Sequence, residues 1–402
     1  YFETLSPEKT GISFTNQLTE TDSFNYMTFQ YIYNGGGVAV GDINNDGLTD
    51  IYFTGNQVAD KLYLNKGGMV FEDITKSALG EVAEDGWHTG VTMADVNEDG
   101  NLDIFVSRSG MDNEGEALRN FLLINQGDNT FKEEGLKWGL STERGTNQSA
   151  LFDMDNDGDL DLYCMNKPYP EEEMNIPVNL DTFPYSDQLF ENVGGKFVDV
   201  SKKAGILNEG YGLGIAISDL NQDGYMDIYI SNDYITPDFM YINNGDGTFT
   251  DEINDRTNHC SMYAMGNDVA DFNNDGLVDI IVADMVSEDH IRSKKNMGPM
   301  SPDDFWGQVK RGNQMEYMFN TLQMNNGNGT FSDIGQLAGV SKTDWSWATL
   351  FADFDNDGMK DLFITNGYRR DVRDNDFVKE YNKEKSLADE IKEIHDLLDK
   401  AP

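Results

Sequence analysis

Carboxylate and amide side chains recur along this chain in one fixed pattern, Asp-x-(Asp/Asn)-x-Asp-Gly-x-x-Asp. Six copies begin at Asp42, Asp95, Asp153, Asp219, Asp271 and Asp353. Oxygen atoms at alternate positions let a short loop wind around a hard cation such as Ca²⁺, which takes six to eight oxygen ligands. Cys and His are absent from all six copies, which argues against zinc or copper. The pattern therefore predicts a series of calcium loops.

Each loop offers side-chain oxygens from positions 1, 3, 5 and 9 and a backbone carbonyl from position 7, while the glycine at position 6 allows the turn. The expected ligands of up to six Ca²⁺ ions are Asp42, Asn44, Asp46, Leu48, Asp50, Asp95, Asn97, Asp99, Asn101, Asp103, Asp153, Asp155, Asp157, Asp159, Asp161, Asp219, Asn221, Asp223, Tyr225, Asp227, Asp271, Asn273, Asp275, Leu277, Asp279, Asp353, Asp355, Asp357, Met359 and Asp361. The loops from Asp153 and Asp353 carry Asp at position 3, and we expect these two to bind most tightly.

The residues after each loop separate this pattern from an EF-hand. An EF-hand needs Glu at position 12 and then a helix. Position 12 is apolar here in every copy, and the runs that follow, such as IYF, IFV and IIV, are typical of strands. The alternative is an Asx-rich turn that binds no metal.

The loops punctuate a larger repeat. A small-residue strand precedes each loop and an apolar strand follows it, and in five repeats a hairpin such as MYINNGDGTFTDE comes next. Loop starts lie about 50 to 80 residues apart, and four strands per repeat are typical of a β-propeller blade. The sequence therefore predicts an all-β propeller of four-stranded antiparallel blades. Residues 1–14 match the end of a blade and are predicted to be a closing outer strand.

The loops and the NNGDGTF hairpins resemble the FG-GAP/VCBS repeat family of integrin-α-like calcium propellers. The stretches YNGGGVAVGD, TDWSWATLFADFDNDG and ITNGYRRD resemble a branch of Bacteroidota surface lipoproteins with ASPIC/UnbV-type relatives. This resemblance implies seven blades where six loops are visible. The expected organisation is a propeller over residues 1–370 with an insertion at 284–320, followed by a C-terminal helical extension over 371–402.

The composition restricts the partners. The 402-residue chain has a formal charge of −43, so nucleic acid, whose phosphates require Lys and Arg, is an improbable partner. No apolar run is long enough to span a bilayer. Low-affinity calcium sites are suited to surroundings with millimolar calcium. We therefore expect a secreted protein, or one anchored by lipid to the extracellular face of an outer membrane.

The ligand face is expected opposite the calcium loops. Eight residues before the first Asp of four loops lie the aromatic residues Trp87, Tyr211, Tyr263 and Trp345, with His88 and Trp347 close by. They are predicted either to form a ligand-binding ring or to pack between blades. The 284–320 insertion adds a basic cluster to this face, made of Arg292, Lys294, Lys295, Lys310 and Arg311, with Phe305 and Trp306.

Three functions compete. The first is a non-catalytic binding module, an accessory of a nutrient-uptake system of the SusC/SusD type or of an adhesion system; its partner would be an outer-membrane transporter or another surface lipoprotein, or its ligand a glycan or peptide. The second is a calcium-dependent polysaccharide lyase using His88, Tyr211, Tyr263 and Arg292. The third is a structural domain of a longer surface protein. No HExxH or GxSxG motif is present, and we predict no catalytic residues.

Overall fold

The computed structural model describes residues 2–26, 28–84, 86–110, 118–141, 143–167, 179–180, 183, 185–234, 236–296, 302–367 and 374–376. The chain divides into two compact units. The first unit comprises Tyr1–Thr19 and Gly35–Glu209, and the second comprises Glu20–Asn34 and Gly210–Pro402. Each unit contains three of the six Asp-rich loops. Most of the predicted extension over 371–402 lies outside the described residues.

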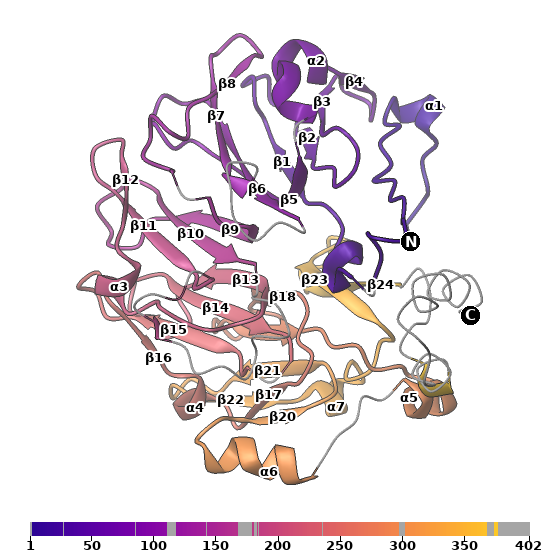
Figure 1. Cartoon of the computed structure of the whole chain (residues 1–402), viewed down its shortest axis with the longest axis vertical. Helices are drawn as coiled ribbons and strands as arrows, with labels where there is room; N and C mark the ends of the chain where they lie inside the picture. The colour runs from indigo at the N-terminus through magenta and orange to yellow at the C-terminus, as the bar shows by residue number, and fades with distance from the viewer. Residues whose placement is uncertain are drawn as a thin grey trace. The chain divides into compact units, whose positions relative to one another are not determined.

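The described part of the first unit contains three four-stranded antiparallel sheets, and in each the strands are neighbours in chain order (Figure 1). Their strands are β1 Val38–Gly41, β2 Asp50–Phe53, β3 Lys61–Asn65, β4 Phe71–Asp73, β5 Trp87–Ala94, β6 Asp103–Ser109, β7 Phe121–Asn125, β8 Phe131–Glu133, β9 Thr146–Phe152, β10 Asp161–Asn166, β11 Gln188–Asn192 and β12 Phe197–Asp199. This is the blade structure that the sequence predicted.

The described part of the second unit contains two sheets of the same kind and two smaller ones. The four-stranded sheets consist of β13 Gly212–Ser218, β14 Asp227–Asn232, β15 Phe239–Asn243, β16 Phe249–Asp251, β18 Asn267–Ala270, β19 Asp279–Val282, β21 Thr321–Asn325 and β22 Phe331–Asp333. A parallel pair joins β17 His259–Ser261 to β20 Met315–Tyr317, and an antiparallel pair joins β23 Ser346–Ala352 to β24 Asp361–Asn366. The chain thus has the all-β, β-propeller-like class that was predicted.

Short helices follow most of the outer strands. They are α2 Thr75–Ala78, α3 Ser201–Ala204, α4 Ile253–Arg256 and α7 Gly335–Ala338, and the other helices are α1 Pro7–Thr10, η1 Gln30–Tyr33, η2 Gly80–Glu84, α5 His290–Lys295 and α6 Pro302–Lys310. The last two and β20 lie within the 284–320 insertion, which is therefore partly folded. Helix α6 has the sequence PDDFWGQVK.

Apolar residues on both faces of a sheet are buried against the neighbouring sheet. One cluster joins Tyr52 and Leu62 of the first sheet to Ile104 and Val106 of the second. The opposite face of the second sheet, with Phe105, packs against the third sheet. Burial of each such side chain contributes about 1.5–3 kcal/mol, so the continuous apolar strands predicted from sequence are explained by two-sided packing.

The N-terminal segment differs from the predicted closing strand. Residues 2–14 contain α1 and no strand, and they lie against the first sheet of their own unit. The Ser13 N–H donates to the Tyr63 hydroxyl (3.3 Å), and Phe14 stacks on Phe53 with ring centroids 5.1 Å apart. Pro7 has no N–H to donate to a strand ladder, and Gly11 ends the helix at a φ of 78°, a left-handed conformation that favours glycine.

Candidate metal loops and an aromatic pocket

All six Asp-rich loops share one backbone conformation. The residue before the loop pairs with the ninth residue, as Gly41 pairs with Asp50 and Ala94 with Asp103. The glycine at position 6 has a positive φ in every loop, and so does the residue at position 4, which is Asn in four loops, Glu98 in the second and Gln222 in the fourth. Asn tolerates this left-handed region better than most residues, so the loop sequence matches its geometry at two positions.

The first carboxylate of each loop organises the turn. Asp42 accepts the N–H of Asp46 at Oδ1 (3.1 Å) and the N–H of Gly47 at Oδ2 (2.7 Å). Asp46 in turn accepts the N–H of Leu48 (2.9 Å). The same three bonds recur in the other five loops. These backbone bonds gather the oxygen-bearing side chains of positions 1, 3 and 5 on the inside of the turn.

Two loops bring three carboxylates close enough together that they could hold a cation. Oxygen atoms of Asp153, Asp155 and Asp161 lie within 4.8 Å of one another, as do those of Asp353, Asp355 and Asp361. These are the two loops with Asp at position 3, which were expected to bind calcium most tightly. In three of the four loops with Asn at this position, those with Asn44, Asn221 and Asn273, the side-chain amide donates to the carboxylate at position 5 instead, as Asn44 does to Asp46 (3.1 Å). The donor set, oxygen atoms alone, fits Ca²⁺.

The ninth Asp has a role that the sequence did not reveal. In the first five loops it is buried, and its two oxygens accept two backbone N–H groups, one from position 2 and one from the third strand. For Asp103 these donors are Val96 (3.1 Å) and Asn125 (2.8 Å). Burial raises the pKa of Asp103 to about 6 and that of Asp161 to about 7. The ninth Asp therefore ties the loop to the hairpin with or without metal.

The sixth loop lacks this second tie. Asp361 accepts the N–H of Phe354 (3.0 Å) but is exposed, and β24 has no third strand beside it among the described residues. This agrees with the sequence, in which no hairpin follows the sixth loop.

Adjacent loops within a unit are linked by the side chain at position 4. Asn45 donates to the carbonyl of Gly100 in the next loop (3.0 Å), Gln222 to that of Gly276 (2.5 Å) and Asn274 to that of Gly358 (2.9 Å). Asn or Gln at position 4 is the sequence feature that marks these links. It does not by itself predict them, because the donor and the acceptor are more than 50 residues apart in sequence.

A second set of buried acceptors stands at the start of the third strand. Asp60 accepts the Tyr52 hydroxyl (2.6 Å) and the Gly55 N–H (2.8 Å), and Asp187 and Asp238 make the equivalent contacts in their own sheets. Burial raises the pKa of Asp238 to about 7. Asn120 and Asn320 take the place of Asp in the other two sheets. The recurring (Asp/Asn)-x-(Leu/Met) of these strands could have identified the set.

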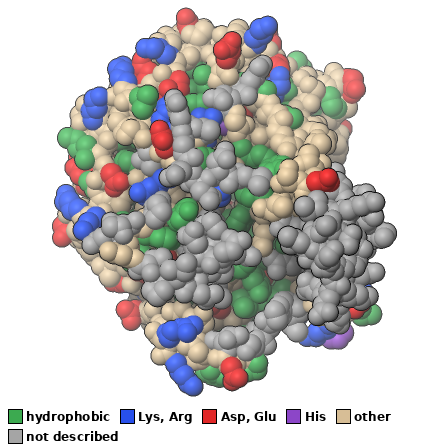
Figure 2. All heavy atoms as spheres, in the orientation of Figure 1, with side chains coloured by type: hydrophobic (Ala, Val, Ile, Leu, Met, Phe, Trp, Pro, Cys, Tyr) green, Lys and Arg blue, Asp and Glu red, His purple; other side chains and the backbone are tan. Residues whose placement is uncertain are grey.

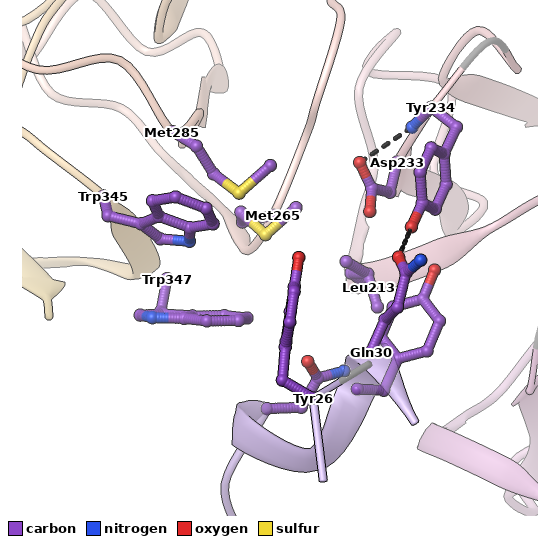
Figure 3. Close-up of a pocket in the computed structure, with 11 residues that line it drawn as sticks. Tyr26, Gln30, Leu213, Asp233, Tyr234, Met265, Met285, Trp345 and Trp347 are labelled. Atoms are coloured by element: carbon purple, nitrogen blue, oxygen red, sulfur yellow. Dashed lines mark hydrogen bonds between the residues drawn. The ribbon is translucent and has the colours of Figure 1, made fainter. Parts of the chain in front are cut away.

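An aromatic pocket lies in the second unit, at the ends of the strands opposite the metal loops. Figure 3 shows most of its walls, which consist of Tyr26, Gln30, Tyr31, Asn34, Leu213, Asp233, Tyr234, Met265, Met285, Trp345 and Trp347. The strand register places it: Gly212 pairs with Asn232 at this end of the sheet, whereas Ser218 pairs with Asp227 beside the loop. The empty space is about 300 Å³ including the open mouth.

The segment before the first repeat builds one wall of this pocket. Within Glu20–Asn34, Ile32 is fully buried and anchors η1, while Tyr26 stacks on Tyr33 with ring centroids 6.2 Å apart. The Gln30 side chain accepts a hydrogen bond from the Tyr234 hydroxyl (Figure 3). The run FNYMTFQYIYN could have identified this wall from the sequence, because it concentrates aromatic residues outside the repeat pattern.

The predicted ligand residues are dispersed. Only Trp345 and Trp347 line the pocket, and the Trp347 indole N–H donates to the Gly367 carbonyl (2.7 Å). Tyr211 is buried behind the wall, edge-on to Tyr234 at 5.2 Å. The Tyr263 N–H donates to Asp284 (3.3 Å), and Tyr263 does not line the pocket.

Trp87 and His88 belong to the first unit. Trp87 starts β5 and is half-buried, whereas His88 is only 1% exposed. The His88 Nδ1 lies 2.7 Å from Asp60, and its ring is edge-on to Phe121. His88 is therefore a core residue, and its burial removes it from a ligand-binding ring.

The residues proposed for a lyase do not surround a metal loop. Tyr211 and Tyr263 precede β13 and β18, at the ends of these strands that lie away from the loops. Arg292 forms an ion pair with Asp344 (2.5 Å).

The basic cluster is partly neutralised by neighbouring acids. Lys295 lies 3.4 Å from both Asp374 and Asp376, while Lys and Arg side chains gather over the α6 region at the lower edge of Figure 2.

Both cysteines, Cys164 and Cys260, are buried free thiols, and burial raises the pKa of each. Among the described residues, no helix is long and apolar enough to cross a membrane.

Three stretches of the chain match a known repeat type. The FG-GAP-like repeat family matches residues 42–106, 219–282 and 305–364. The chain therefore contains FG-GAP-like repeats in three places; the first two matches each include two Asp-rich loops, and the third includes the loop from Asp353.

Particular relatives are distant. Cartilage acidic protein 1 of Xenopus tropicalis is 30% identical over 208 residues, which are 50% of this chain and 29% of that protein. The Homo sapiens protein is 26% identical over 203 residues, 50% of this chain and 28% of its own length. The chain thus aligns with less than a third of these relatives.

Solved structures are similar only in part. An Agrocybe aegerita lectin that recognises non-reducing terminal N-acetylglucosamine has a TM-score of 0.45 and 18% identity, over 81% of this chain and 73% of the lectin. The Vibrio cholerae biofilm matrix protein Bap1 has a TM-score of 0.34 and 14% identity, over 74% of this chain and 38% of its own. At these values the similarities carry no functional conclusion.

Proposed function

We propose that this chain is a non-catalytic, calcium-stabilised extracellular binding module whose ligand occupies the aromatic pocket. The observation that carries this proposal is the division of chemistry within the second unit. Oxygen-rich loops lie at one end of the strands, and an aromatic pocket with two tryptophans lies at the other. Large aromatic surfaces with a few polar groups are typical of ligand sites.

Calcium would be held by positions 1, 3, 5 and 9 of the loops. The carboxylate clusters around Asp153 and Asp353 support this assignment, as do the FG-GAP-like repeats. A bound cation would neutralise carboxylates that otherwise repel one another, and binding only to the folded chain would add to its stability. Sites of this kind suit an extracellular location, where calcium is abundant.

The partner in the cell is proposed from the resemblance of the sequence to surface lipoproteins. It would be an outer-membrane transporter of the SusC/SusD type or another surface lipoprotein, with this chain on the extracellular face. Purification from native membranes under calcium, followed by identification of the copurifying proteins, tests this part. Copurification of cytoplasmic proteins alone would contradict it.

Array binding tests the site itself. We expect glycan or peptide arrays to give a signal with the wild type that is lost in the Trp345→Ala/Trp347→Ala double variant. Trp306→Ala is the matched control, because Trp306 is 52% exposed on α6 and does not line the pocket. An equal loss in the control, or an unchanged signal in the double variant, would locate binding elsewhere.

A further inference from the structure

The pocket walls present soft, electron-rich surfaces from different directions. In Figure 3 the rings of Trp347 and Tyr26 are both seen edge-on and are not parallel, Trp345 lies beside Trp347, and the sulfur atoms of Met265 and Met285 lie near Trp345. The tyrosine comes from Glu20–Asn34 and the tryptophans from the start of β23. Ring faces directed at one space from several sides attract a cation through their quadrupoles.

The charge of the pocket favours the same kind of ligand. Among the described residues that line the pocket, Asp233 is the acidic one, and none is Lys or Arg. One oxygen of Asp233 accepts the Tyr234 N–H (2.8 Å), which fixes the carboxylate in the wall. The chain as a whole carries a formal charge of −43, which would raise the local concentration of cations and repel anions.

The size of the pocket restricts the ligand further. Its empty space of about 300 Å³ includes the open mouth and the solvent there, so the enclosed part is smaller. This space suits a compact head group better than several sugar rings. Tyr26, Met265 and Trp345 are each less than 8% exposed, so a group that enters would lose most of its water. Weakly hydrated cations tolerate this loss best.

We propose that the pocket binds a quaternary ammonium group, with Trp347, Trp345 and Tyr26 as an aromatic cage and Asp233 as the counter-charge. This inference rests on the proposed function and names the ligand class of the same pocket. The trimethylammonium group is shared by free choline and by phosphocholine attached to a larger molecule. The two sources differ in their phosphate, which the acidic chain would disfavour.

Titration calorimetry with the calcium-loaded chain tests this directly. The probes are choline, phosphocholine, N-acetylglucosamine and 3,3-dimethyl-1-butanol, the neutral isostere of choline. We expect choline to bind at least about tenfold more tightly than the isostere, a difference of about 1.4 kcal/mol, because the isostere has no charge for the cation–π contacts of a desolvated site. We also expect phosphocholine to bind more weakly than choline. Tighter binding of phosphocholine would contradict free choline as the source while leaving the cage intact.

Two variants separate the rings from the charge. Trp347→Leu keeps an apolar side chain without a ring face, and Asp233→Asn keeps an acceptor for the Tyr234 N–H. Each should weaken choline binding about tenfold and change binding of the isostere little. Trp306→Leu is the control and should change neither. Thermal unfolding of every variant establishes that it is folded, and the comparison of choline with its isostere on the wild type needs no variant.

The outcomes distinguish this inference from the proposed function. Equal binding of choline and its isostere, or preferential binding of N-acetylglucosamine that Trp347→Leu abolishes, would overturn the ammonium cage and leave the binding pocket in place. Binding of choline that survives both Trp347→Leu and Asp233→Asn would place the cation elsewhere and also overturn the cage. Binding of none of the probes, with array ligands still bound in the pocket, refutes the cage alone.

Discussion

Replacing Asp103 by Ala tests whether the ninth residue of a loop supports the fold independently of metal. Asp103 is 1% exposed, and its oxygens accept the N–H groups of Val96 and Asn125. Without the carboxylate, both donors remain buried and lose their partner. Asp361→Ala is the matched control, because Asp361 occupies the same loop position, is exposed, and accepts one loop N–H, from Phe354.

The magnitude follows from these contacts. Each buried donor left without a partner costs about 1–3 kcal/mol, so Asp103→Ala should lower the free energy of unfolding by about 2–6 kcal/mol. Water can reach the single donor at Asp361, so Asp361→Ala should cost about 1 kcal/mol or less. A domain of this size loses about 2–4 °C in Tm for each kcal/mol. Asp103→Ala should therefore lower the Tm by roughly 4–24 °C.

The assay is thermal unfolding by calorimetry at pH 8 in EDTA. Chelation removes the contribution of metal, and this pH keeps Asp103 ionised, because its pKa is raised by burial only to about 6. Equal losses in the two variants would refute the reasoning. A loss for Asp103→Ala that appears in calcium and vanishes in EDTA would show that this carboxylate acts only as a ligand.

Four further results are expected. EDTA should lower the Tm of the wild type and increase proteolysis, with recovery on adding excess calcium; an unchanged Tm would contradict calcium stabilisation. Tyr229→Phe should lower the free energy of unfolding in urea by about 1–3 kcal/mol, because the buried Asp238 loses a donor at 2.6 Å. The double variant Tyr229→Phe/Asp238→Asn should recover part of this loss, since the second sheet has Phe and Asn at the equivalent positions. No recovery would argue against a shared acceptor role. Glu98→Gln should raise the Tm, because Glu98 repels Asp159 and Gln can donate to the next loop as Gln222 does; a lower Tm would refute this link. Burial, and then the charge of Asp238, raise the pKa of Glu316 to about 8. The stabilisation by protonated Glu316 is therefore complete below the unfolded pKa of about 4.3 and is lost as pH rises through 8. The decline in Tm from pH 5 to 9 should be smaller in Glu316→Gln than in the wild type, and unchanged in the exposed control Glu288→Gln.

Local features of the fold were predictable because they depend on neighbouring residues. Alternate oxygen-bearing residues with Gly47 and its equivalents specify the loop, and the apolar runs after them specify strands. The Asn-Gly hairpins specify the return strands. The two loops in which three carboxylates lie close together are those with Asp at position 3, namely Asp155 and Asp355, so they too could be predicted.

The pocket was only partly predictable. Trp345 and Trp347 could be placed at one end of an inner strand, but Tyr26 and Gln30 come from a segment outside the repeats, and its packing depends on contacts more than 170 residues away in sequence. The burial of His88 depends on Asp60, which directly precedes β3 and is 28 residues away in sequence. Neither side-chain pattern nor spacing contains that information.

The position-4 links have a consequence for how ions would enter and leave. Asn274 joins its own loop to the Gly358 carbonyl of the next, and Gln222 does the same one repeat earlier. A turn that is straightened by loss of its ion would pull on the donor or the acceptor of such a bond. Since the pull would distort the neighbouring turn, occupancy of one site would raise the affinity of the next, and three loops in series would respond to falling calcium over a narrower range than three isolated ones.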